Sequence, residues 1–194
     1  TELYCAKIFS NDTTMSFIAI IDATIIIMQT VPSILEKTPE DLFFQINKPS
    51  LYFKHFQIDI ADGIFVPNKT VQIDDILKFF DSKDFINFIT LQTLKTLSFD
   101  FHLMVYDFES DIKKLNQLKK FINIKSVLIH YSAIKNIKLK IENLSDIPIG
   151  LVLDPQDQIN DLSTRYNLNT IPCIQIMSVT PGVQGNPFIP DTLY

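Results

Sequence analysis

Two short segments of the chain alternate apolar and polar residues, and this pattern limits the possible folds more than any other feature. Residues Phe56–Ala61 and Phe99–Met104 each place every second side chain on one apolar face, which predicts β-strands. The segments between the predicted strands have helical patterns, so the sheet should be parallel and covered on both faces. In an antiparallel sheet the polar face would simply meet solvent. In a covered parallel sheet it favours a functional site at the carboxyl ends of the strands.

Predicted strands and helices alternate along the chain. The predicted strands are Ile25–Val31, Phe56–Ala61, Phe99–Val105, Ser126–His130, Ile149–Leu153 and Cys173–Val179. The predicted helices cover about 38–47, 71–97 with a break near Asp81-Ser82, 111–121, 134–144 and 157–166. Three successive strands end 24 residues apart, at His130, Asp154 and Ser178, as expected for repeated right-handed βα units. An open doubly wound sheet and a (β/α)8 barrel both fit this pattern, although a barrel would lack two units.

Composition excludes several classes of protein. The 194 residues suffice for one domain, and a net charge of −5 without a basic patch argues against a nucleic-acid partner. The apolar stretch Phe17–Met28 is too short to span a membrane, so no membrane association is expected. The only cysteines, Cys5 and Cys173, lie far apart, which suits a reducing cytosol and predicts a cytoplasmic protein.

The first residues fit the rest of the chain poorly. The sequence begins with Thr1 rather than with methionine, and we expect Met28 to be the natural start. We expect residues 1–27 to be a non-native upstream extension and residues 28–194 to form the domain. A genuine N-terminal extension is the competing interpretation.

Four motifs then occur in order, each at the end of a predicted strand. They are Pro32-Ser33-Ile34-Leu35, Asp59-Ile60-Ala61-Asp62-Gly63-Ile64-Phe65-Val66-Pro67-Asn68, Phe101-His102-Leu103-Met104-Val105 and Met177-Ser178-Val179-Thr180-Pro181-Gly182-Val183-Gln184-Gly185. Together they resemble the ribulose-phosphate 3-epimerase family, whose members are metal-dependent TIM barrels of the pentose phosphate pathway. The resemblance covers about residues 28–194, and it implies an α/β fold with six of the eight βα units of a TIM barrel.

The resemblance implies an isomerase that interconverts D-ribulose 5-phosphate and D-xylulose 5-phosphate through an enediolate. Asp59 would remove the C3 proton and also bind a divalent metal, commonly zinc, with iron, manganese or cobalt as alternatives. His102 would be a second metal ligand. Ser33, Met104, Met177, Gly182 and Gly185 would contact the substrate, the two glycines from a loop near its phosphate. His130 receives no catalytic role, and the Asp154-Pro155 pair should only end a strand.

Three departures from the family pattern matter. Gln57 occupies the position of a metal-binding His, and an amide oxygen is a weaker zinc ligand than imidazole. Ala61 replaces a Met, which should widen the pocket. The chain ends at Tyr194, before strands seven and eight of the family barrel, which carry the second catalytic Asp. We therefore expect this polypeptide alone to be inactive, because one base cannot return a proton to the far face.

Two alternatives stay open. A non-catalytic homologue that binds sugar phosphates would be favoured by Gln57 and Ala61. An epimerase of a hexulose phosphate such as allulose 6-phosphate would be favoured by Ala61. The expected partner is in each case a small sugar phosphate, and the full-length protein could form a homo-oligomer.

Overall fold

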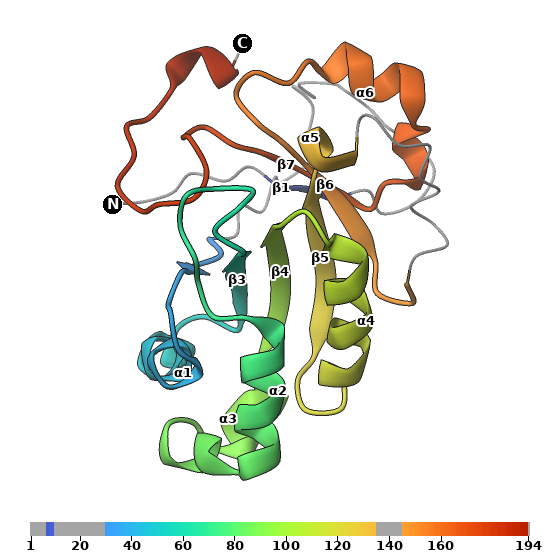
Figure 1. Cartoon of the computed structure of the whole chain (residues 1–194). Helices are drawn as coiled ribbons and strands as arrows, with labels where there is room; N and C mark the ends of the chain where they lie inside the picture. The colour runs from blue at the N-terminus through green and yellow to red at the C-terminus, as the bar shows by residue number, and fades with distance from the viewer. Residues whose placement is uncertain (1–6, 10–29, 135–144, 194) are drawn as a thin grey trace, which may run out of the picture.

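A computed structural model describes residues 7–9, 30–134 and 145–193, and its core is one seven-stranded sheet (Figure 1). The strands are β1 (Lys7–Phe9), β2 (Ser33–Ile34), β3 (His55–Ala61), β4 (Ser98–Met104), β5 (Ile124–His130), β6 (Ile149–Leu153) and β7 (Cys173–Ile176). Their order is β1-β7-β6-β5-β4-β3-β2. Strands β2 to β7 are parallel, and β1 is antiparallel to β7. The predicted incomplete TIM barrel is thus confirmed as six parallel strands in a sheet that does not close.

Helices follow most strands, as the apolar periodicity predicts. They are α1 (Pro39–Asn47), α2 (Ile73–Ser82), α3 (Leu91–Thr96), α4 (Phe108–Leu118), α5 (Tyr131–Ile134) and α6 (Ile159–Arg165), with 3-10 turns at Pro49–Leu51, Asp84–Asn87, Leu168–Thr170 and Pro190–Leu193. Thr38 caps α1 by accepting a hydrogen bond from Asp41 N at 3.1 Å. The predicted break near Asp81-Ser82 is present, because Lys83 adopts a left-handed conformation that ends α2. Of the helix predicted at 134–144, residues 135–144 lie outside the described part of the chain.

The first predicted strand is wrong in the part that the structure describes. Residues 25–29 lie outside the described residues, and Thr30 and Val31 belong to no strand. Strand β2 instead begins at Ser33, after the proline that we expected to end the strand. Proline lacks an N–H but keeps its carbonyl, and the Pro32 carbonyl accepts a hydrogen bond from Gln57 N at 2.9 Å. Proline therefore starts the pairing with β3.

The two faces of the sheet differ in chemistry. The outer face carries Phe56, Ile58, Phe99 and Phe101, which are fully buried in the main apolar core beneath the helices. The inner face carries the polar side chains of β3 to β7. These are His55, Gln57, Asp59, Ser98, Asp100, His102, Ser126, His130 and Gln175, each at most 8% exposed. Burial on both faces is what a parallel sheet requires, and it leaves the inner polar groups dependent on one another for hydrogen bonds.

At the amino ends of the strands, the inner polar groups form a closed cluster. His55 Nε2 lies 2.6 Å from Asp100 Oδ2, and His55 Nδ1 lies 2.8 Å from Ser98 Oγ. Ser126 donates to Asp100 Oδ1 at 2.6 Å. Polar side chains of β3, β4 and β5 thus form hydrogen bonds with one another. This cluster lies away from the carboxyl ends of the strands, where the sequence predicts a site.

Gly150 lets strands β5 to β7 approach closely on the same inner face. A Cβ atom at this position would lie 2.6 Å from the Cys173 carbonyl oxygen and 2.8 Å from a Leu128 methyl carbon. Any side chain would push the strands apart, so the need for glycine here is steric. Within the described residues, every helix is too short or too polar to cross a bilayer.

Candidate active site

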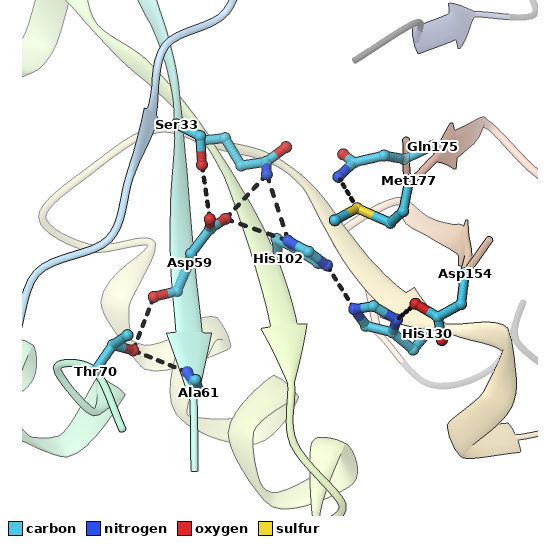
Figure 2. Close-up of polar contacts among 10 residues, drawn as sticks. Ser33, Asp59, Ala61, Thr70, His102, His130, Asp154, Gln175 and Met177 are labelled. Carbon is cyan, nitrogen blue, oxygen red and sulfur yellow. Dashed lines mark hydrogen bonds and ion pairs between the residues drawn. The ribbon is translucent and has the colours of Figure 1, made fainter. Parts of the chain in front are cut away.

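Asp59 is the centre of a hydrogen-bonded group at the carboxyl ends of β2, β3 and β4. Strand pairing places Asp59 directly opposite His102, and both side chains lie on the inner face (Figure 2). Ser33 Oγ donates to Asp59 Oδ2 at 2.7 Å, and Gln57 Nε2 donates to Oδ1 at 2.9 Å. His102 Nδ1 lies 3.2 Å from the same Oδ1 atom. The residues predicted for proton abstraction, metal binding and one substrate contact are therefore adjacent.

Thr70 fixes the end of β3 from the other side. Its hydroxyl donates to the Asp59 carbonyl oxygen at 2.8 Å and accepts from Ala61 N at 2.8 Å. Asp62 then holds the following loop, because its Oδ1 atom accepts from the amides of Ile64 and Phe65, both at 2.7 Å. These hydrogen bonds fix the backbone at Asp59 and just after it, and they thereby fix the position of the Asp59 side chain.

Asp59 is ionised at neutral pH although it is only 8% exposed. Burial alone would raise the pKa of Asp59, but hydrogen bonds from His102, Gln57 and Ser33, with the charge of His102, lower it below the ordinary value of 3.8. The Asp59 carboxylate is therefore well oriented to accept a proton, but its lowered pKa makes it a weak base.

His102 connects this group to two residues that the sequence did not assign to the site. His102 Nε2 lies 2.7 Å from His130 Nε2, and His130 Nδ1 lies 2.9 Å from Asp154 Oδ1 (Figure 2). Burial lowers the pKa of His130, and the contact with Asp154 offsets only part of that effect. Burial would raise the pKa of Asp154, but His130 and Ser132 lower it overall.

The other predicted contact residues surround a pocket above Asp59. The pocket, a small cavity of about 30 Å³ that is partly open to solvent, is lined by Ser33, Leu35, Asp59, His102, Met104, Met177, Val179, Thr180, Pro181, Gly182, Val183 and Gln184. Gly182 has a φ of 110°, and a Cβ there would lie 2.9 Å from Val66 Cβ, so the loop needs glycine at this point. Gly185 belongs to the same loop but does not line the pocket.

Ala61, which we expected to widen the pocket, lies next to the pocket residue Met104. Its side chain is fully buried beside Val66 and Met104, and it is absent from the pocket lining. The methyl group packs against the loop that follows β3. The wider pocket relative to a methionine at this position stays a prediction.

Two of the described residues predicted to bind a metal ion lie close enough together to share one. Asp59 Oδ1 and His102 Nδ1, 3.2 Å apart, could share a cation. Gln57 turns its amide nitrogen, which cannot ligate, toward both atoms, at 2.9 Å and 3.4 Å. No group of three or more His, Cys, Asp or Glu side chains suited to a metal occurs in the described part of the chain.

His130, Asp154 and Gln175 are the inner polar residues that sequence reasoning missed. The regular spacing of the strand ends points to His130 and Asp154, but by itself it predicts only that a strand ends at each of them. Gln175 is 2% exposed, and its Nε2 atom contacts Met177 Sδ at 3.5 Å. Its Oε1 atom has no hydrogen-bond partner among the described residues. His130, Asp154 and Gln175 share one signal in the sequence: the alternation of each strand places them on the inner face of a covered parallel sheet.

Acidification should destabilise the protein because His130 is held neutral. The unfolded chain takes up a proton near pH 6.5, whereas folded His130 does so only at lower pH. The free energy of unfolding should therefore fall as pH drops below 6.5, with a slope of at most about 1.4 kcal/mol per pH unit from this residue. Asp59 and Asp154, whose folded pKa values are lowered, add their losses only below their ordinary value of 3.8.

Urea unfolding at several pH values checks this prediction. The His130→Gln variant should be less stable at neutral pH but should lose the pH dependence between about pH 6.5 and pH 5. Equal slopes for the two proteins across that range would show that His130 is not the responsible group.

Comparisons with known proteins agree with the motifs. A family model described as the ribulose-phosphate 3 epimerase family matches residues 29–194. The chain is 30% identical over 138 residues to a ribulose-phosphate 3-epimerase of Synechocystis sp., covering 70% of this chain and 53% of that protein. It is 28% identical over 140 residues to a ribulose-phosphate 3-epimerase of Chlamydia muridarum, with the same coverages. The chain spans about half the length of these curated relatives.

Proposed function

This chain belongs to the ribulose-phosphate 3-epimerase family, and on that basis we propose that the whole protein interconverts D-ribulose 5-phosphate and D-xylulose 5-phosphate. The observation that carries the proposal is the ionised Asp59 carboxylate at the floor of a pocket, held by Ser33, Gln57 and His102. An oriented carboxylate within reach of a bound sugar is what abstraction of a proton beside a carbonyl requires.

In this mechanism the chain's own residues bind and orient the substrate and accept its proton. Asp59 Oδ2, which faces Ser33, or Oδ1, which faces His102, takes the C3 proton. Met104 and Met177 provide an apolar wall that limits water near the carbanionic carbon. Asp59 and His102 are the described side chains that would hold a divalent cation, which supplies Lewis-acid stabilisation of the enediolate when bound. The loop containing Gly182 borders the pocket, where it would approach the phosphate.

Proton exchange in heavy water tests the proposal. Incubation of the full-length protein with D-ribulose 5-phosphate in D₂O should give D-xylulose 5-phosphate that carries deuterium at C3, as detected by ¹H NMR. Retention of the C3 proton in every recovered sugar would contradict it. Reading both sugars separates proton abstraction, which Asp59 performs, from inversion, which needs a second acid.

One observation favours a second candidate, a sugar-phosphate-binding homologue without catalysis. Gln57 turns an amide N–H group, rather than a ligand, toward the place where a cation would lie. The hexulose-phosphate alternative, which the small side chain of Ala61 favours, also stays a prediction. Binding of the pentose phosphate with no C3 exchange would favour the non-catalytic homologue.

Restoring an imidazole at position 57 should strengthen cation binding. In Gln57→His, the new side chain would join Asp59 and His102 on the same inner surface. Outer-shell partners alone change metal affinity by about 10–100-fold, so an added direct ligand should raise Zn²⁺ affinity by at least that factor. Isothermal titration with Zn²⁺ measures the change, and Gln57→Asn, which adds no imidazole, is the control. An equal affinity in the two variants would place the cation elsewhere.

A further inference from the structure

Two loops that lie far apart in the sequence meet beside the candidate pocket. The first, residues 62–69, directly follows β3, the strand that carries Asp59. The second, residues 178–189, comes after β7, and its residues 179–184 line the pocket together with Asp59. Figure 1 shows the two loops close to each other at the carboxyl end of the sheet. The contacts that keep the second loop in this place therefore determine the shape of the pocket.

The loop after β3 is firmly anchored. Asp62 Oδ1 accepts from the amides of Ile64 and Phe65, and Asp62 Oδ2 accepts from the Tyr106 amide at 3.1 Å. The last of these bonds ties the loop to the segment that follows β4. Asp62 and Lys69, at the two ends of the loop, also form an antiparallel bridge. The loop is thus fixed at both ends, and it can support another segment.

The loop after β7 is closed at its base and exposed near its tip. Ile189 N donates to the Ser178 carbonyl oxygen at 2.7 Å, and this bond closes the base. Asn186 Nδ2 donates to the Thr180 carbonyl oxygen at 2.7 Å, which is a contact within the loop. Residues 183–185 are exposed. Neither bond joins this loop to the support that the other loop offers.

The two loops meet at Gly182, which is buried although the residues after it are exposed. The half-buried Asn68 donates from Nδ2 to the Gly182 carbonyl oxygen at 2.7 Å. A Cβ atom at Gly182 would lie 2.9 Å from Val66 Cβ, so the Gly182 backbone packs directly on the Val66 side chain. The hydrogen bond opposes movement of the loop away from this contact, and the valine opposes movement closer. Together they fix the position of Gly182 at the pocket.

We propose that Asn68 is a positioning residue that holds the loop after β7 in place beside Asp59. The acceptor is a backbone carbonyl, so this contact depends on the side chain at position 68 and on the close approach that Gly182 permits. Loss of one neutral hydrogen bond should increase the population of displaced loop by about 2–10-fold. The use of the loop to contact a sugar phosphate rests on the proposed function, whereas its position is a property of the ligand-free protein.

Nitrogen-15 NMR of glycine-labelled protein tests the proposal without any substrate. The chain has only four glycines, so the amide of each can be followed separately. In the wild-type protein, Gly182 should be as ordered as Gly150 in β6, with an order parameter of about 0.85. Gly185 should be more mobile, because a Cβ atom there would have no neighbour within 4 Å. A wild-type Gly182 as mobile as Gly185 would overturn the proposal, even if no variant can be purified.

Two substitutions of Asn68 test whether its amide supplies the restraint. Asn68→Asp keeps the shape of the side chain but removes both N–H donors, and Asn68→Ala removes the whole amide. In both variants the order parameter of Gly182 should fall toward that of Gly185, and the other two glycines should not change. Asn186→Ala is the matched control, because it removes a bond of the same length and type within the loop. An unchanged Gly182 in either folded Asn68 variant, or an equal loss of order in Asn186→Ala, would overturn the proposal.

Steady-state kinetics of the full-length protein tests what the loop position is used for. A displaced loop weakens the contacts with the substrate, so Asn68→Ala should raise KM for D-ribulose 5-phosphate by about 2–10-fold with little change in kcat. A lower apparent kcat at unchanged KM would mean only a loss of folded protein and would refute the role in binding. A wild-type protein with an ordered Gly182 but without epimerase activity would retain the positioning role and lose the epimerase proposal.

Discussion

Replacing Asp59 with Asn should lower kcat for epimerisation by about 10²–10⁴-fold or more, the usual contribution of a positioned general base. The asparagine keeps the size of the side chain: its one oxygen can still accept from Gln57, and its NH2 group can donate to the Ser33 hydroxyl, which can also accept. Substrate binding should therefore change much less than turnover, and KM should stay within a few-fold of the wild-type value. Steady-state assays of the full-length protein with D-ribulose 5-phosphate measure both parameters.

Asp100→Asn provides the matched control for this experiment. Asp100 is another buried carboxylate on the inner face, but it pairs with His55 at the amino ends of the strands. That variant should retain most of the activity, whereas Asp59→Asn should not. Similar kcat values for the two variants would show that Asp59 is not the base.

Removing the Asp100 carboxylate altogether should cost about 3–5 kcal/mol of stability, as expected when one partner of a buried pair is deleted. Asp100 accepts hydrogen bonds from His55 Nε2 and from the Ser126 hydroxyl, both at 2.6 Å. Asp100→Ala would leave these two donors without that acceptor. The residue is 2% exposed, so water cannot replace the lost partner without opening the sheet. Urea denaturation at neutral pH gives the free energy of unfolding.

A surface ion pair of nearly equal length shows how much of that cost comes from burial. Lys114 Nζ lies 2.7 Å from Asp74 Oδ2, but the Asp74 side chain is 52% exposed. Asp74→Ala should therefore change the unfolding free energy by no more than about 1 kcal/mol. Equal losses in Asp74→Ala and Asp100→Ala would mean that the inner cluster contributes no more than a surface contact.

The sequence predicted the strands β3 and β4 well, because alternation with a period of two determines which side chains share a face. Once Asp59 and His102 were placed on the inner face of neighbouring strands, direct pairing was enough to bring them together. The beginning of β2 was predicted wrongly. A proline predicts a break in a strand, but the free carbonyl of Pro32 starts the parallel ladder with β3.

The distal half of the site could not be predicted because it depends on how strands are staggered. The pairing of β4 with β5 shifts by one residue between Phe99 and Asp100, and this shift decides which residue of β5 reaches His102. A local sequence pattern predicts on which face of the sheet a side chain lies. It does not predict the register, that is, which residue of the neighbouring strand lies beside that side chain. His130 therefore looked like one more strand end, although it is the residue that His102 contacts.

The line of contacts from β3 to β6 also bears on how the protein reaches its native state. It runs across the strands rather than along them, so it exists only when four strands are aligned simultaneously. A slip of β5 by one position would present Ile129 or Tyr131 in place of His130 and would leave His102 without its partner. The contacts across the strands thus form only when the strand register is correct. A misaligned folding intermediate would lack both these contacts and their contribution to stability.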